Sequence, residues 1–535
     1  MTGTPKDGSG SGEEAVGTGT SRRRYLQGLA ALGSAPVLGS VAYESSAATQ
    51  TYEDRFSTVV DMVDAGADPN AGEPIGDLLH EHAGDDTLLQ FPAGEYLMTE
   101  QFRFTDYENF GIVGTDATIV PGTIEELDGR SVVEGTFSGP TRLFRLGVSY
   151  APGDRLLFEG LTFDFTDDQS GFRAIEAYVE RELTVRDVDI DGTHDVGSFG
   201  PALFSVVDPD GISTVEGFRA PDGGSYSENT IGSIEDGPTG ILVPPSHQGK
   251  LWLRDCELGG FPDQGVYASS TDGRVVVKGG VYRNSNSANV RLMSDYSYIQ
   301  DATIVVDEAH EGHNQRAIRL DAGKHLWVYN TEIRLSDPNG HAIVVYNDVE
   351  KARIQECDIT VGEGESNYGI IVRPDAGGVD VFDTTIQFEG SGNPLLVRGR
   401  NDDGDAPVHV LRTQISGSGP GTDGRNAIRC LRANALFEDV EVHVDGDYYR
   451  RGIEIHGDDC TVDGGVFEST HHPIVNVADG TVLDDLTARS YDGYAGLKLY
   501  DGYSDVTVTD STIYEGYLDQ GTDDLVVDGV EFPDS

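Results

Sequence analysis

The phrase Val-x-Asp-x-x-Ile and its close variants recur along most of this chain, and this recurrence constrains the fold more than any other feature. Each copy closes on an apolar residue, and subtraction gives steps of about 19 to 29 residues, apart from one long gap. The closing residues are Phe163, Ile190, Leu258, Val281, Ile304, Ile333, Ile359, Ile386, Ile415, Val442, Val466, Ala488, Ile513 and Phe532. A repeat of this length indicates an array in which each unit stacks on its neighbours.

A second apolar triplet follows the turn in each repeat, as in Val290-Arg291-Leu292 and Ile318-Arg319-Leu320. Alternation with period two over such short runs is typical of β-strands, and the outer residues of each triplet should point inward. A β-propeller blade needs about 40 to 50 residues, and the leucine-rich repeat phrase is absent. The repeat therefore predicts an all-β chain whose coils stack in parallel, which is a parallel β-helix.

The chain carries 92 acidic and 37 basic residues, a formal net charge of −55 spread over its whole length. Such a surface repels phosphate backbones, so nucleic acid is excluded as a partner. Only six of the basic residues are lysines. This composition resembles that of haloarchaeal proteins, in which concentrated salt screens charge repulsion. The acidity therefore predicts a halophilic protein and says little about its activity.

The N-terminal region resembles a twin-arginine export signal. Arg22, Arg23 and Arg24 precede a weakly apolar run from Gly28 to Ala42, and small residues follow at positions 46–48. This order predicts a disordered head and signal peptide over residues 1–48 and a secreted or cell-surface protein. The apolar run is shorter than the roughly 20 residues that a membrane span needs, and no membrane span is predicted.

Four cysteines could form two disulfides in an exported protein. Cys256 and Cys357 each lie two residues before a closing residue, so both should face inward, but they are four repeats apart. At about 4.8 Å per coil this separation exceeds the distance that a disulfide can bridge. We therefore expect buried free thiols at all four positions, which are Cys256, Cys357, Cys430 and Cys460.

The residues that precede the repeats resemble those of a known protein family. Asp64–Asp68 is followed by an amphipathic stretch, Ile75–His82, and then by Phe91-Pro92-Ala93-Gly94-Glu95-Tyr96. This arrangement resembles the N-terminal region of the pectate lyase-like superfamily. The resemblance implies a right-handed parallel β-helix with a short N-terminal capping helix. It divides the chain into a cap with the first coils at 49–145 and the repeats at 146–535, with an insertion at about 197–250.

Outward positions of the second strand should form columns along the stack, one residue per coil. The first column is predicted to hold Arg291, Arg319, Val344, Ile371, Leu396, Arg429, Glu454, Asn476 and Lys498, and the second Met293, Asp321, Tyr346, Arg373, Arg398, Leu431 and His456. Arginine binds carboxylates through paired hydrogen bonds. We therefore predict an acidic polysaccharide as partner, bound by Arg291, Tyr346, Arg373, Arg398 and Arg429. The alternative is that these arginines pair with local acids such as Asp295, Asp321 and Asp375.

Related lyases use an arginine or lysine as base, often with calcium, so the resemblance implies these for an elimination reaction. Arg319 is the predicted base, with Asp321 as its orienting residue or as a cation ligand, and His313 of His310-Glu311-Gly312-His313 is an alternate. Glycoside hydrolysis instead needs two carboxylates at a defined separation. The signature phrases of polygalacturonases, the main pectate lyases and alginate epimerases are missing. A lyase or hydrolase and a non-catalytic surface scaffold therefore both stay open, and no metal-ligand set is indicated.

Overall fold

The computed structural model describes residues 52–122, 132–133, 136–137, 142–195, 200–226, 238–309, 314–399 and 406–534. The chain divides into two units, residues 1–54 and residues 55–535. In the first unit the described residues form one 3-10 turn, η1 (Tyr52–Asp54). The predicted signal peptide and His313 lie outside the described residues. The second unit contains the fold on which all that follows depends.

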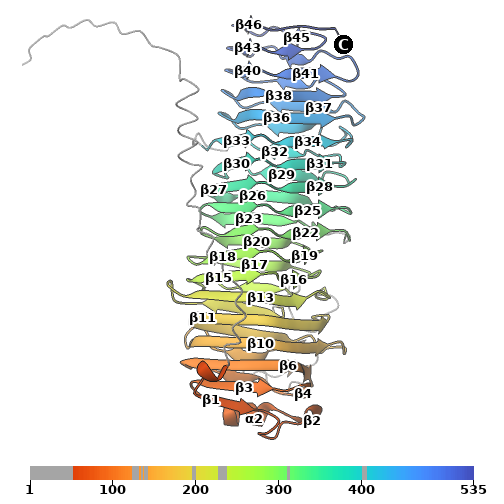
Figure 1. The fold of residues 1–535 in the computed structure, drawn as a ribbon. Helices are drawn as coiled ribbons and strands as arrows, with labels where there is room; N and C mark the ends of the chain where they lie inside the picture. The colour runs from red at the N-terminus through yellow and green to blue at the C-terminus, as the bar shows by residue number, and fades with distance from the viewer. Residues whose placement is uncertain are drawn as a thin grey trace, which may run out of the picture. The chain divides into compact units, whose positions relative to one another are not determined.

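The second unit is a parallel β-solenoid of about 15 turns, which confirms the predicted β-helix (Figure 1). Each turn contributes strands to three columns, named A, B and C here. Column A contains β5 (Phe102–Phe104), β9 (Arg142–Leu146), β12 (Ala202–Val206), β14 (Ile241–Val243), β17 (Gln264–Thr271), β20 (Ala288–Ser294), β23 (Ile318–Gly323), β26 (His341–Val349), β29 (Tyr368–Val372), β32 (Leu395–Val397), β35 (Asn426–Cys430), β37 (Arg451–Ile455), β39 (Ile474–Asn476), β42 (Leu497–Leu499) and β45 (Tyr517–Asp519).

Columns B and C follow column A in each turn. Column B contains β1 (Thr58–Asp61), β3 (Thr87–Phe91), β15 (Lys250–Arg254), β18 (Arg274–Lys278), β21 (Tyr298–Gln300), β24 (Leu326–Tyr329), β27 (Lys351–Gln355), β30 (Gly378–Phe382), β33 (Val408–Leu411), β40 (Val482–Asp484), β43 (Thr507–Thr509) and β46 (Val526–Asp528). Column C contains β2 (Asn70–Pro74), β4 (Gly94–Met98), β16 (Glu257–Leu258), β19 (Val281–Arg283), β22 (Thr303–Val306), β25 (Glu332–Leu335), β28 (Asp358–Val361), β31 (Thr385–Phe388), β34 (Gln414–Gly417), β41 (Thr487–Ser490) and β44 (Thr512–Ile513).

Some strands run through more than one column without a break. These are β6 (Asn109–Pro121), β10 (Gly153–Phe165), β13 (Ile212–Ala220), β36 (Leu436–Val444) and β38 (Thr461–Ser469), which pass from B to C, and β11 (Arg173–Gly192), which passes through all three. A separate antiparallel pair joins β7 (Val132–Val133) to β8 (Thr136–Phe137). The apolar core fills the space between the three columns, with Val, Ile and Leu side chains of each coil packed on those of the next.

The aspartate of the repeated phrase has a backbone role at the corner between columns B and C. One residue per coil at this corner has a positive φ, in the left-handed region. Examples are Asp187 (φ 49), Asp301 (φ 56) and Asp383 (φ 49), with Gly279 (φ 67) in the same place. Aspartate, asparagine and glycine tolerate this conformation better than other residues. The recurrent Asp therefore turns the chain from one column to the next, and the closing apolar residue begins the inward face of column C.

Two predicted closing residues are displaced by one position. The residue that aligns with Leu258 and Ile304 is Tyr282, which is fully buried, whereas Val281 is 40% exposed. In the same way Phe467, rather than Val466, aligns with Val442. A Gly-Gly pair precedes each of these sites, and all four glycines have positive φ. The extra bend shifts the period-two pattern by one residue, so that the next side chain faces the core.

The long gap between Ile190 and Leu258 contains one further coil. Asp189 pairs with Arg219 and Ala220 pairs with Leu258, so Ala220 is the closing residue of this coil. The predicted insertion at about 197–250 therefore includes the strands of this coil, β12 and β13, and the strand β14 of the next coil, while residues 227–237 lie outside the described part of the chain. Its phrase was not recognised because Gly217 occupies the left-handed corner in place of Asp.

The predicted capping helix is present as α2 (Gly76–His82), at the N-terminal end of the stack (Figure 1). Leu79 and the preceding Ile75 are fully buried against the first coils. The Phe-Pro-Ala-Gly-x-Tyr phrase links β3 to β4. Tyr96 donates its hydroxyl hydrogen bond to the Pro92 carbonyl at 2.7 Å. A Cβ at Gly94 would lie 2.6 Å from Pro69 Cβ, so only glycine fits there.

All four cysteines are free and buried, as predicted. Burial raises the pKa of both the Cys256 and the Cys357 thiols to about 12, so both stay protonated and act as small apolar groups. Among the described residues no helix is long and apolar enough to cross a membrane.

Candidate functional site

The outward residues of column A follow the predicted first column over most of its length. Arg291, Arg319, Val344, Ile371, Leu396, Arg429 and Glu454 align one above another across consecutive coils. Asn476 was placed in this column wrongly, because Val475 pairs with Glu454 instead. Asn476 faces the interior, where its amide donates to the Ala478 carbonyl at 2.8 Å and accepts from Thr481 Oγ1.

Asp321 lies between two arginines of neighbouring coils. Arg291 Nε is 2.8 Å from Asp321 Oδ2, and Arg319 Nη2 is 3.0 Å from Oδ1. All three side chains are largely buried. The predicted contact between Arg319 and Asp321 is thus present in the structure, and the pairing alternative holds for Arg291 and Arg319. Of the other two acids named for that alternative, Asp295 pairs with Lys324 at 2.7 Å.

Tyr346 lies at the centre of the arginines. The Arg319 guanidinium carbon is 4.6 Å from the centroid of the Tyr346 ring, and that of Arg373 is 5.3 Å from it. One coil before Arg291, Tyr267 places its ring 4.6 Å from the Arg291 guanidinium carbon. These cation–π contacts orient the guanidiniums without neutralising their charge.

Arg373, Arg398 and Arg429 extend this surface toward the C-terminus. None of the three is within ion-pair distance of a carboxylate of the described residues. Nε of Arg373 and Nε of Arg429 are buried without a hydrogen-bond partner. The predicted pairing with Asp375 is therefore not formed by Arg373. Between these arginines the outward side chains of Val344, Ile371 and Leu396 make a buried apolar floor.

Two residues of this surface were not assigned a role from the sequence. Arg316 and His341 lie two positions before the apolar triplets of β23 and β26, on the same outward side. Extending the period-two pattern backward from Ile318 and Ile343 would have assigned both to the inward face, because Ala317 and Ala342 face the core instead and break the alternation. Arg316 Nε and His341 Nδ1 are buried without partners. Burial, reinforced by Arg319 and Arg373, lowers the pKa of Arg316. Burial and then the charges of Arg316 and Arg373 lower the pKa of His341 to about 4, so the imidazole is neutral at pH 7.

We call this surface the arginine strip, defined by Arg291, Arg316, Arg319, Asp321, His341, Tyr346, Arg373, Arg398 and Arg429. It holds six guanidiniums and one carboxylate, a difference of five positive charges, on a chain of net charge −55. Such a concentration of unpaired donors can bind carboxylates or sulfates bidentately.

The strip fits neither a calcium ion nor a pair of hydrolytic carboxylates. Calcium takes six to eight oxygen ligands, but Asp321 already accepts from two guanidiniums. Among the described residues no group of three His, Cys, Asp or Glu side chains is arranged to hold a metal. Asp321 is the one carboxylate of the strip, and Glu454, the next acid in the outward column of Arg319, is five coils away, about 24 Å at the coil spacing. A hydrolytic pair needs about 5 to 9.5 Å.

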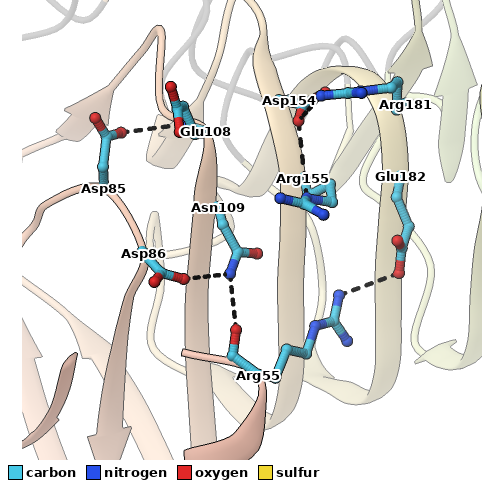
Figure 2. A network of polar contacts seen from close by, with 9 residues as sticks. All are labelled: Arg55, Asp85, Asp86, Glu108, Asn109, Asp154, Arg155, Arg181 and Glu182. Carbon is cyan, nitrogen blue, oxygen red and sulfur yellow. Dashed lines mark hydrogen bonds and ion pairs between the residues drawn. The ribbon is translucent and has the colours of Figure 1, made fainter. Parts of the chain in front are cut away.

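A second polar region lies over the first coils, where columns A and B meet. Figure 2 shows Arg55 donating to Glu182 at 3.1 Å and Asn109 donating to Asp86 at 2.8 Å. Asp154 accepts from Arg181 and lies 3.7 Å from Arg155. We call this the N-terminal network. Beside it is a depression of about 400 Å³ lined by Asp106, Tyr107, Glu108, Pro152, Asp154, Arg155, Glu180 and Arg181. Its acids outnumber its arginines, so it does not offer an anion site.

No protein-family model and no curated protein sequence matches the chain. Solved structures with a similar fold include PfbA, a surface adhesin of Streptococcus pneumoniae (10% identity, 79% of this chain, 92% of that chain, TM-score 0.37). The Gp54 tailspike of Acinetobacter baumannii bacteriophage AP22, in complex with a capsular saccharide, is similar at 11% identity (83% and 77% covered, TM-score 0.37). The catalytic unit of a GH87 α-1,3-glucanase from Streptomyces thermodiastaticus is similar at 12% identity (88% and 68% covered, TM-score 0.29). Likenesses this distant carry no argument about the ligand of this chain.

Proposed function

We propose that this chain is an exported, halophilic carbohydrate-binding β-helix that holds an acidic polysaccharide along the arginine strip. The observation that carries the proposal is the imbalance of six guanidiniums over one carboxylate. On a chain with 92 acidic residues, partners for these arginines are abundant, yet Arg316, Arg373, Arg398 and Arg429 have no carboxylate partner among the described residues. A polymer with a carboxylate on each sugar supplies what the strip lacks.

The spacing of the strip suits an extended polymer. Successive coils are about 4.8 Å apart, close to the length of one sugar residue. The arginines from Arg291 to Arg429 span five coil-to-coil steps, or about 24 Å. Val344, Ile371 and Leu396 are buried beneath the charged groups and support them, so the ligand contacts come from the arginines and Tyr346. In strong salt the long-range attraction is screened within a few Å, so direct hydrogen-bonded contacts provide the affinity.

Elimination is the catalytic reaction that the strip supports best. The sugar carboxylate would accept hydrogen bonds from Arg319 and Arg373, which would favour the enolate formed in the transition state. Neutral His341 would take the C5 proton, the C4–C5 double bond would form, and the C4–O bond would break. The leaving oxygen would then take a proton from imidazolium or water. Arg319, predicted as base, donates to Asp321 and suits charge stabilisation better. His313 stays a prediction.

The rival is a non-catalytic surface scaffold that uses the same strip only for binding. The scaffold is favoured over hydrolysis because the one carboxylate of the strip, Asp321, is already paired with Arg291 and Arg319. The test incubates the purified chain in high salt with uronate polymers and measures binding, unsaturated uronate and new reducing ends. Unsaturated product supports elimination, and binding without product supports the scaffold. Absence of binding to every acidic polymer would contradict the proposal as a whole.

A further inference from the structure

A second group of unpaired cations lies on column B, next to both tryptophans of the chain. Trp252 of β15, Tyr298 of β21 and Trp327 of β24 occupy one outward column, with Val276 of β18 between the first two. Three coil steps separate the tryptophans, or about 14 Å. We call Lys250, Trp252, Arg254, Arg274, Tyr298 and Trp327 the tryptophan patch.

The rings of the patch form one continuous aromatic surface. The Tyr298 ring centroid is 6.3 Å from that of Trp252, edge to face, and 6.3 Å from that of Trp327. Tyr298 is only 7% exposed, whereas Trp327 is 36% exposed. Trp327 therefore exposes an aromatic face to solvent while the buried Tyr298 supports it. Aromatic residues at binding surfaces are commonly arranged in this way.

The cations around these rings have no acidic partner. Lys250 Nζ is 4.1 Å and the Arg254 guanidinium carbon is 4.5 Å from the Trp252 ring centroid. Arg274 lies at the start of the next coil, opposite Lys250. None of the three forms an ion pair with any residue of the described part of the chain. Nε of Arg254 is buried without a partner. Burial lowers the pKa of Lys250, and the charges of Arg274 and Arg254 lower it further.

Other cations on columns B and C show that pairing is the usual arrangement. Arg283 pairs with Asp307, Arg412 donates to Asp383 at 2.6 Å, and Arg353 lies 3.3 Å from Asp380. Cation–π contacts of about 0.5 to 2 kcal/mol hold Lys250 and Arg254 in place but leave their charge uncompensated. The three like charges therefore favour an anion from outside the chain.

We propose that the tryptophan patch is a second binding site for an acidic polysaccharide, with one sugar ring of the polymer on the exposed face of Trp327 and the anionic groups of sugars farther along the polymer on Lys250, Arg254 and Arg274. The site is separate from the arginine strip and shares with the proposed function only the ligand class. A uronate polymer supplies both an anion for the cations and a ring face for the aromatic surface, and single-stranded DNA, which also combines anions with stacking groups, is the rival that the test separates.

The test follows tryptophan fluorescence while the full-length chain is titrated with polygalacturonate fragments in high salt. Because both tryptophans belong to the patch, the signal reports on this site alone. We expect a saturable change whose midpoint rises at least about tenfold in the Lys250→Ala/Arg254→Ala/Arg274→Ala variant. The matched control removes three exposed, paired arginines, Arg283→Ala/Arg334→Ala/Arg412→Ala, and should move the midpoint less than about twofold.

Three outcomes would overturn the site: no fluorescence change at saturating polymer, an equal response to neutral dextran, or a stronger response to single-stranded DNA. A thermal melt verifies that each variant is folded. The Arg319→Ala/Arg373→Ala variant should keep the fluorescence response unchanged. If the strip variant binds less polymer in total but keeps the tryptophan response, the result supports binding at the tryptophan patch independently of the strip. A strip that binds while the fluorescence stays constant overturns the patch and leaves the proposed function in place.

Discussion

The N-terminal network and the arginine strip use the same residue types in opposite ways. In the network, Arg181 reaches Asp154 of the neighbouring coil, Arg55, which precedes β1, reaches Glu182 of β11, and Asp154 is shared between Arg155 and Arg181 (Figure 2). In the strip, the single carboxylate pairs with two of the six guanidiniums, and the other four have no carboxylate partner among the described residues. Acids are abundant on this chain, so pairing is easily obtained, and its absence in the strip requires an explanation beyond charge balance. The comparison supports a stabilising role for the paired arginines of the early coils and leaves the unpaired arginines of the strip available to the proposed ligand.

The two regions also differ in what their charges contribute to stability. The network pairs are partly exposed, with Arg181 64% exposed, and such pairs contribute about 0 to 1 kcal/mol each. The strip charges lie on a buried apolar floor, and Arg316 and His341 both have lowered pKa values because burial disfavours their charged forms. The strip is therefore costly for the free protein, and a bound anion would offset that cost.

The largest expected effect comes from removing two unpaired or half-paired arginines of the strip. Arg319→Ala/Arg373→Ala should weaken binding of acidic polymer at least about a hundredfold, because each charged hydrogen bond contributes roughly 1.5 to 3 kcal/mol. Isothermal titration in high salt measures the change. The matched variant in the network, Arg155→Ala/Arg181→Ala, should leave the affinity within about threefold. Equal losses in both variants would contradict the distinction between the regions.

Beyond the strip, the next charged outward residue of column A, Glu454, is paired again. The pH dependence of the unfolding free energy can detect this pairing. Glu454 accepts from Arg451 and from His456, and these groups lower its pKa to about 2 against the effect of burial. A carboxyl group whose pKa is lower in the folded than in the unfolded chain stabilises the fold at pH values above the unfolded pKa of 4.5. This stabilisation, up to about 3 kcal/mol, is lost as the pH falls from 4.5 toward 2. Denaturant unfolding from pH 6 to 2.5 should show this slope.

Glu454→Gln is the control for the acid titration. It should reduce the loss of stability between pH 4.5 and 2 while leaving the rest of the pH profile parallel to the wild type. An unchanged slope in this variant would show that other carboxyls account for the acid sensitivity.

Asp321 and Asp154 offer a direct comparison of the acids at the centres of the two regions. Asp321→Asn should lower the free energy of unfolding by about 2 kcal/mol, because two largely buried guanidiniums lose their shared partner. Asp154→Asn should cost less than about 1 kcal/mol, since Arg181 is mostly exposed. Urea titration at pH 7 measures both values. If Asp321→Asn costs no more than Asp154→Asn, the strip is more hydrated than its burial implies.

The smallest expected effect comes from adding a second carboxylate to the strip, beside Arg429. Leu396 is an outward residue in the same column as Arg429, and Leu396→Glu would provide a carboxylate there, as in the network. Binding of acidic polymer should weaken about tenfold, or roughly 1.4 kcal/mol, through competition for the guanidiniums. Leu396→Gln has the same shape without the charge and should retain most of the affinity. Equal weakening by both variants would point to the lost apolar floor instead.

The inward and outward faces of the coils could be predicted because alternation with period two is a local property of a strand. The prediction was wrong where a local element interrupted the period, at the Gly-Gly pairs before Tyr282 and Phe467. Asn476 was misplaced for a related reason, since its polarity suggested an outward position while its amide is satisfied inside by Ala478 and Thr481. Arg316 and His341 were missed because Ala317 and Ala342 face the core and interrupt the alternation just before each triplet.

The amino-acid sequence by itself determined the stacked coils, the capping helix, the buried thiols and the residues that share an outward column. These follow from alternation, turn residues and repeat length, all of which act within one coil. Only the tertiary structure decided which charges are paired, because an ion pair joins residues of adjacent coils, some 25 residues apart, through their register and rotamers. It placed Asp321 between Arg291 and Arg319, left Arg373 free above Tyr346, and gathered the tryptophan patch on column B.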